Sequence, residues 1–163
     1  MRRIINNRQI IEDRWRQVAD AEPLPPEGAV IVSLTRWRQE RQALLARPNK
    51  RVGVRLKNDE PVADIAVDLP YFAVIALEFP TFKDGRALTQ ARLLRERYGY
   101  RGELRAVGDV LRDQIFFMQR CGFDAFELRS DQSLEDALEA FDEFTVTYQP
   151  AADEPLPLYR RGR

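Results

Sequence analysis

The sequence predicts a single α/β domain with a mainly parallel sheet. With 163 residues, the chain is long enough to bury one core and too short for two ordinary domains. From residue 29 onward, short apolar runs that suit strands alternate with stretches of helical periodicity. Such alternation favours right-handed crossovers and parallel pairing. The sheet is then either open and doubly wound or part of a β/α barrel, because a complete barrel needs more repeats than fit.

The first 28 residues predict a small N-terminal β-hairpin followed by a linker. Two isoleucine pairs, Ile4-Ile5 and Ile10-Ile11, flank the turn-forming pair Asn6-Asn7. Residues 22–28 are rich in proline and cannot continue a helix or a central strand. We therefore place the α/β core domain at 29–150 and expect an extended or disordered tail at 151–163.

Within the core, β-branched and apolar runs predict strands at 29–32, 51–56, 71–77, 103–107 and 124–128. Helical spacing predicts helices at 35–47, 89–98 and 109–120, and a capping box at Ser133 opens a further helix that reaches Phe141. The segment 62–69 is either a helical turn or a connector. The run at 71–77 is apolar throughout, which is typical of a strand at the centre of the sheet.

Composition excludes several classes of function. Lys plus Arg and Asp plus Glu both total 26, so no net charge draws the chain to nucleic acid or to a membrane surface. The chain has no histidine and one cysteine, Cys121, which removes His-activated nucleophiles and the usual zinc and iron–sulfur ligand sets. The sequence predicts no secretion signal, membrane span or glycine-rich nucleotide loop. We expect a cytoplasmic protein without a metal or a cofactor, and Cys121 as a buried filler.

Candidate functional residues follow the carboxyl ends of three predicted strands, where parallel sheets bind ligands. They are Glu78, Asp84, Arg86, Asp109, Arg112 and Arg129. In one interpretation the arginines bind an oxyanion, and Glu78 or Asp109 transfers a proton or orients an arginine. In the other, Asp109 is a helix N-cap and the arginines pair with nearby carboxylates.

Four segments of the chain resemble a proteobacterial family of unknown function. These segments are Asp84-Gly85-Arg86, Ala91-Arg92-Leu93-Leu94-Arg95, 102–114 and 121–126. Members of that family are typically encoded beside assimilatory sulfite reductase, and some carry an oxidoreductase label. The resemblance implies a role in sulfite reduction. No motif for siroheme, flavin or an iron–sulfur cluster accompanies it.

Three hypotheses follow, and whether the chain catalyses a reaction is left open. The first, which we prefer, is an accessory protein of assimilatory sulfite reduction that docks on sulfite reductase or its electron donor through an exposed apolar or Arg-rich patch. The second is a small enzyme or binding module for an oxyanion such as sulfite, in which Arg86, Arg112 and Arg129 converge in one pocket with Glu78 or Asp109. The third is a degenerate barrel fragment that serves as a structural subunit.

Overall fold

A computed structural model describes residues 2–48 and 51–142 as one eight-stranded sheet in the order β2-β1-β8-β7-β6-β5-β4-β3. The strands are β1 (Arg3–Asn6), β2 (Gln9–Glu12), β3 (Trp15–Gln17), β4 (Ala29–Ser33), β5 (Val52–Leu56), β6 (Val74–Phe79), β7 (Glu103–Gly108) and β8 (Ala125–Phe126). Strands β3 to β8 pair in parallel, and β1 is antiparallel to both β2 and β8. The mainly parallel sheet and the N-terminal hairpin are thus confirmed.

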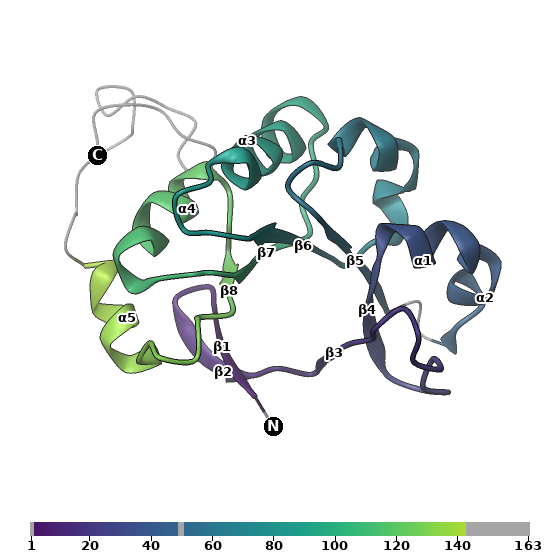
Figure 1. Ribbon diagram of the computed structural model, residues 1–163, viewed down its shortest axis with the longest axis horizontal. Coiled ribbons are helices and arrows are strands. Elements are labelled where there is room, and N and C mark those ends of the chain that lie inside the picture. The colour runs from purple at the N-terminus through teal and green to yellow at the C-terminus, as the bar shows by residue number, and fades with distance from the viewer. Residues whose placement is uncertain (1, 49–50, 143–163) are drawn as a thin grey trace, which may run out of the picture.

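The sheet curls into a half-barrel whose convex side carries the helices, as Figure 1 shows. These are α1 (Leu34–Gln39), α2 (Arg41–Leu45), α3 (Arg86–Arg92), α4 (Ile115–Cys121) and α5 (Leu134–Ala140). They are joined by the 3-10 helices η2 (Val62–Tyr71) and η4 (Arg112–Gln114) and by the π-helical turn η3 (Leu93–Arg97). Of the two predicted architectures, the partial barrel is correct. The doubly wound sheet is wrong because its helices would cover both faces.

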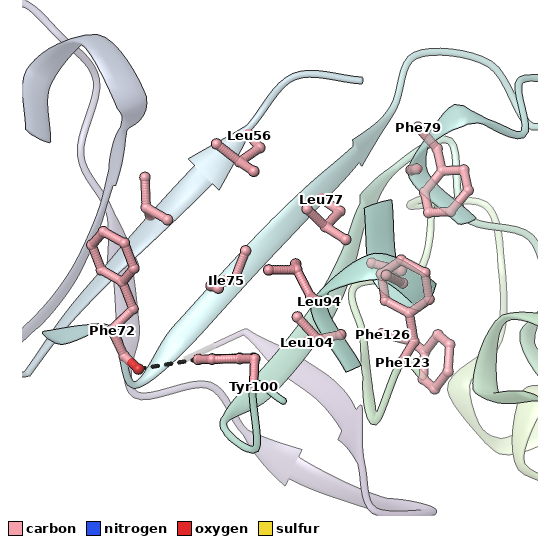
Figure 2. Packing of buried hydrophobic residues seen from close by; sticks show 14 of the residues in the cluster. Leu56, Phe72, Ile75, Leu77, Phe79, Leu94, Tyr100, Leu104, Phe123 and Phe126 are labelled. Carbon is pink, nitrogen blue, oxygen red and sulfur yellow. Dashed lines mark hydrogen bonds between the residues drawn. The ribbon is translucent and has the colours of Figure 1, made fainter. Parts of the chain in front are cut away.

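The hydrophobic core lies between the convex face of the sheet and the helices (Figure 2). Alternate strand residues such as Ile75, Leu77 and Leu104 point into it and are fully buried. Each such side chain contributes roughly 1.5–3 kcal/mol by leaving water. The Tyr100 hydroxyl donates a hydrogen bond of 3.1 Å to the Phe72 carbonyl, and burial raises the pKa of this phenol, which keeps it neutral.

The concave face is packed differently. It holds a small apolar cluster of Ile31, Val74, Ala76 and Val107, with Trp15 packed against it. Because β6 contributes to this cluster as well as to the convex core, its residues Val74–Leu77 are all buried, which confirms β6 as a central strand.

Some boundaries differ from the sequence prediction. The hairpin turns at Asn7 and Arg8, which both have positive φ, one residue later than expected. Strand β3 was missed. The predicted helix 35–47 is divided into α1 and α2, and the predicted strand 124–128 is reduced to Ala125–Phe126. Segment 62–69 belongs to the 3-10 helix η2.

One helix end and two predicted caps also bear on the sequence analysis. Gly122 ends α4 with a positive φ of 122°. As the sequence predicts, the Ser133 hydroxyl caps α5 by accepting from the Asp136 N–H at 3.2 Å. The predicted cap at Asp109 is wrong, because the next helix begins only at Arg112. Cys121 is buried, as predicted for a filler of the core. The predicted tail at 151–163 lies outside the described residues, and none of the described helices is long and apolar enough to span a membrane.

Candidate functional site

The concave face of the sheet holds two arginines in one layer of residues. Strand register places Arg55 beside Ala76, Ala76 beside Arg105, and Arg105 beside Ala125. Alanines flank Arg105 on both sides, and Arg55 lies between Ala76 and Ser33; these small neighbours leave space for both guanidinium groups inside the curl of the sheet. The layer therefore places positive charge inside the half-barrel.

Arg105 is the centre of a buried ion network. Its side chain is only 1% exposed; its Nε donates to Glu103 at 2.8 Å, and its Nη1 donates to Asp13 at 2.9 Å and to Glu127 at 3.1 Å. Arg2 adds a second cation, 3.0 Å from Glu127 and 3.6 Å from Asp13. A buried charge is tolerated only when it is paired in this way.

Burial and the neighbouring charges shift the pKa values of Glu103 and Arg105 in this network. Burial raises the pKa of Glu103, and the neighbouring Arg105 only partly opposes it. Burial lowers the pKa of Arg105, but the charges and hydrogen bonds of Glu103 and Asp13 outweigh this effect and raise it. Arg105 is therefore a fixed cation, whereas Glu103 takes up a proton at higher pH than an ordinary glutamate does. Among the described residues, no cluster of His, Cys, Asp or Glu suits a metal ion.

Gln17 connects this network to Arg55. Its Nε2 donates to both carboxylate oxygens of Glu127, at 3.0 and 2.7 Å, while its Oε1 accepts from Nη1 of Arg55. On its other side Arg55 donates from Nε to Glu78 at 2.8 Å. These bonds use two of the three guanidinium nitrogens and leave Nη2 of Arg55 without an acceptor in the described part of the chain.

A cavity of about 1040 Å³ opens at this position, and we call it the concave pocket. It lies at the carboxyl end of the sheet, where ligands bind in β/α barrels, since it is lined by the last residues of β7 and by those just after β8. Its charged lining consists of four arginines, Arg2, Arg14, Arg16 and Arg55, and three acids, Glu12, Asp13 and Glu127. Arg14 forms no ion pair with any residue that the structure describes.

The six residues predicted from the sequence do not converge in one pocket. Glu78 alone reaches the concave side, where it holds Arg55. Asp84 and Arg86 form a pair of their own, with Nη2 of Arg86 2.8 Å from the Asp84 carboxylate. Hydrogen bonds from the Arg86 side chain and backbone hold the pKa of Asp84 at about 2.

Asp109 and Arg129 meet at a third position. Nη1 of Arg129 lies 2.8 Å from Asp109 and its Nε lies 2.7 Å from Asp131, so one guanidinium joins two carboxylates. These bonds raise the pKa of Arg129, and Arg129 in turn holds the pKa of Asp131 at about 2. Arg112 lies apart and donates from Nε to the Asp136 carbonyl at 3.0 Å. A functional role for these residues stays a prediction.

Sequence reasoning missed most of the concave pocket. Arg55 and Arg105 each sit mid-strand between apolar neighbours, which is typical of a half-solvated face. The sequence pattern does not show that the sheet curls, and it is the curl that places this face on the inside of the half-barrel. The signal that could have found the site is the set of charged residues at alternate positions of adjacent strands.

A family model for bacterial proteins of unknown function (DUF934) matches residues 53–159, more than half of the chain. The chain is a DUF934 protein. The DUF934 match begins within β5, so Arg55, Glu78, Arg105 and Glu127 fall inside it, while Asp13 and Gln17 come from the segment before it. No match was found among curated proteins or among solved structures.

Proposed function

We propose that this DUF934 protein is a cytoplasmic accessory protein of assimilatory sulfite reduction that holds a small oxyanion, sulfite or a close relative, in the concave pocket. The resemblance of the four segments at 84–86, 91–95, 102–114 and 121–126 supports the link to sulfite reduction. The observation that carries oxyanion binding is Arg55, which Glu78 and Gln17 hold at the pocket with Nη2 available.

The chemistry of the pocket suits such a ligand. Nη2 of Arg55 carries two N–H donors for an oxyanion, and a guanidinium binds more tightly when its orientation is already fixed. Arg14, which has no ion pair among the described residues, supplies a second guanidinium to the lining of the pocket. Because the lining arginines outnumber the lining acids, a small anion fits the charge of the pocket better than a cation does.

Calorimetry with the full chain tests this binding directly. We expect heat of binding with sodium sulfite and none with sodium chloride, and we expect Arg55→Gln to weaken sulfite binding by about tenfold or more. The matched control is Arg129→Gln, which removes an arginine that also lies between two polar partners but outside the pocket. Absence of sulfite binding up to about 10 mM, or equal binding by Arg55→Gln, would contradict the proposal.

Growth tests address the sulfur link. A deletion strain is grown on sulfate, sulfite, sulfide or cysteine as the sole sulfur source, with wild-type and Arg55→Gln complements. We expect failure on sulfate and sulfite, growth on sulfide, and no rescue by Arg55→Gln. Normal growth of the deletion strain on all four sources would count against a role in sulfite reduction.

Docking on sulfite reductase or on its electron donor is the second candidate, favoured by an exposed aromatic pair. Phe82 and Phe117 are 39% and 50% exposed and, with Leu88 and Met118, line a cavity of about 410 Å³ between the start of α3 and α4. Exposed apolar patches of this kind mark interaction surfaces. We expect the protein to co-elute with the reductase and a Phe82→Ser, Phe117→Ser variant not to; Val67→Ser, also at an exposed apolar position, is the control.

A further inference from the structure

A second cavity, of about 430 Å³, lies on the helical side of the sheet and shares no lining residue with the concave pocket. One wall is the turn after β5 with the start of η2. The other wall is one side of α3 and the π-helical turn η3. The lining residues are Asn58, Asp59, Glu60, Pro61, Val62, Ala63, Arg86, Thr89, Gln90, Leu93, Arg97 and Tyr98.

Opposite charges come from opposite walls of this cavity. Asp59 projects from the turn after β5, and Arg97 comes from the π-helical turn. Within 2–48 and 51–142, neither side chain makes an ion pair or a hydrogen bond; Arg97 only stacks over the Tyr98 ring at 6.0 Å. By contrast, Glu60 accepts a hydrogen bond from the Lys57 N–H, and Arg86 forms an ion pair with Asp84. One carboxylate and one guanidinium are thus available to a ligand.

Gln90 supplies an independent sign of a missing partner. Its residue is only 6% exposed, and its Nε2 donates to the carbonyls of Lys57 and Glu60, both at 2.9 Å. These two bonds fix the orientation of the amide, and Oε1 is left buried without a hydrogen bond in the described residues. An unmet buried acceptor is costly, so a small shift of this wall that let a ligand donor reach Oε1 would be favoured.

The π-helical turn points to the same place. Such turns are rare, and they occur frequently at functional sites. This one runs over Leu93–Arg97 and gives the cavity both an apolar surface, Leu93, and the available guanidinium of Arg97. Val62 and Pro61 on the opposite wall extend the apolar surface.

We propose that this cavity binds a free α-amino acid with an apolar side chain. The ligand's ammonium group is matched by Asp59 and by Oε1 of Gln90, and its carboxylate is matched by Arg97. Its side chain packs on the apolar surface. Charges of opposite sign on opposite walls select a zwitterion over a simple anion or cation, which would leave one of the two charges without a partner.

Calorimetry with the full chain and three related probes tests the proposal. L-Methionine carries both charges, N-acetyl-L-methionine lacks the ammonium group, and L-methioninamide lacks the carboxylate. We expect L-methionine to bind and each analogue to bind at least about tenfold more weakly, because each leaves one protein charge unmatched. No binding of L-methionine, L-leucine or L-valine up to about 10 mM, or equal binding of the analogues, would overturn the proposal.

Substitutions of residues that line the cavity test whether the ligand binds there. Asp59→Asn and Arg97→Gln change charges that form no ion pair or hydrogen bond within the described residues, so both variants should fold normally and weaken L-methionine binding by about tenfold or more. Arg101→Gln, at an exposed arginine outside the cavity, is the matched control and should bind as the wild type does. Arg55→Gln should also leave L-methionine binding unchanged, which separates this site from the oxyanion pocket. Binding that survives both Asp59→Asn and Arg97→Gln would overturn the assignment to this cavity.

Discussion

The inside of the half-barrel and its outer loops contain the same ionic motif in different surroundings. Inside, Arg105 lies among Asp13, Glu103 and Glu127 and has a side chain that is 1% exposed. Outside, Arg129 lies between two carboxylates with a side chain that is 42% exposed. The bond lengths are alike, so geometry alone does not rank the two clusters. Burial does, because water replaces a lost partner only at the surface.

The largest effect is expected from Arg105→Met. Removing this guanidinium leaves three buried carboxylates, Asp13, Glu103 and Glu127, with Arg2 as their remaining cation among the described residues. This should cost about 3–5 kcal/mol of the free energy of unfolding. Arg129→Met, the matched change in the exposed cluster, should cost far less. Urea unfolding of both variants, followed by tryptophan fluorescence, checks the difference. Equal losses would show that burial does not separate the two clusters.

The same pair of variants should differ in their response to pH. Burial raises the pKa of Glu103 above its ordinary value of 4.5, and loss of Arg105 removes the cation that opposes this shift. The folded form then binds more protons than the unfolded form, so stability falls as pH rises from 4.5 through the raised pKa.

The deficit of Arg105→Met should therefore shrink by about 1–2 kcal/mol when unfolding is measured near pH 5 instead of pH 7.5. Arg129→Met does not take the cation away from a buried carboxyl of this kind. Its loss of unfolding free energy should therefore stay nearly constant over the same pH range. Parallel pH profiles for the two variants would refute the interpretation of Glu103.

A third effect, smaller than that of Arg105→Met, concerns Gly53, which lies on the concave side between Ile31 and Val74. A Cβ at this position would lie 2.8 Å from the Val74 carbonyl oxygen, a backbone atom that cannot move cheaply. We expect Gly53→Ala to cost about 1–3 kcal/mol. Gly85→Ser is the control, because the nearest atom to a Cβ there is 4.0 Å away and serine suits a helix N-cap. A neutral Gly53→Ala would mean that the strands can separate locally.

These tests also indicate what the sequence could reveal. Local patterns were sufficient for the parallel α/β order, the central strand β6 and the cap at Ser133. Local patterns did not predict the curl of the sheet. The alternation that places Arg55 and Arg105 on one face does not show whether that face is open to water or enclosed by the curled sheet. Asp13 and Gln17 were missed because they join the network from the far edge of the sheet, through contacts distant in sequence.

The predicted site illustrates the same limit from the other side. Asp84 with Arg86, and Arg129 with Asp131, are two residues apart in the chain, and local spacing alone already suggested that the arginines pair with nearby carboxylates. The structure shows these pairs. Spacing could not show whether the six candidate side chains come together in space. They do not, since Arg112 and Glu78 are held by different partners in separate places.

The smallest effect that we predict lies in the exposed cluster and separates it from the interior at low pH. Hydrogen bonds from Arg129 hold the pKa of Asp131 at about 2, below its ordinary value of 3.8. Such a carboxylate stabilises the fold above pH 3.8 and loses that contribution as pH falls toward 2. Asp131→Asn lacks this contribution. When the free energy of unfolding is measured by urea unfolding at a series of pH values, the wild-type and variant curves should therefore converge at the acid end. The interior behaves oppositely, because Glu103 favours the folded state when it is protonated. A gap between the two curves that persists at acid pH would mean that Asp131 acts through its shape, not its charge.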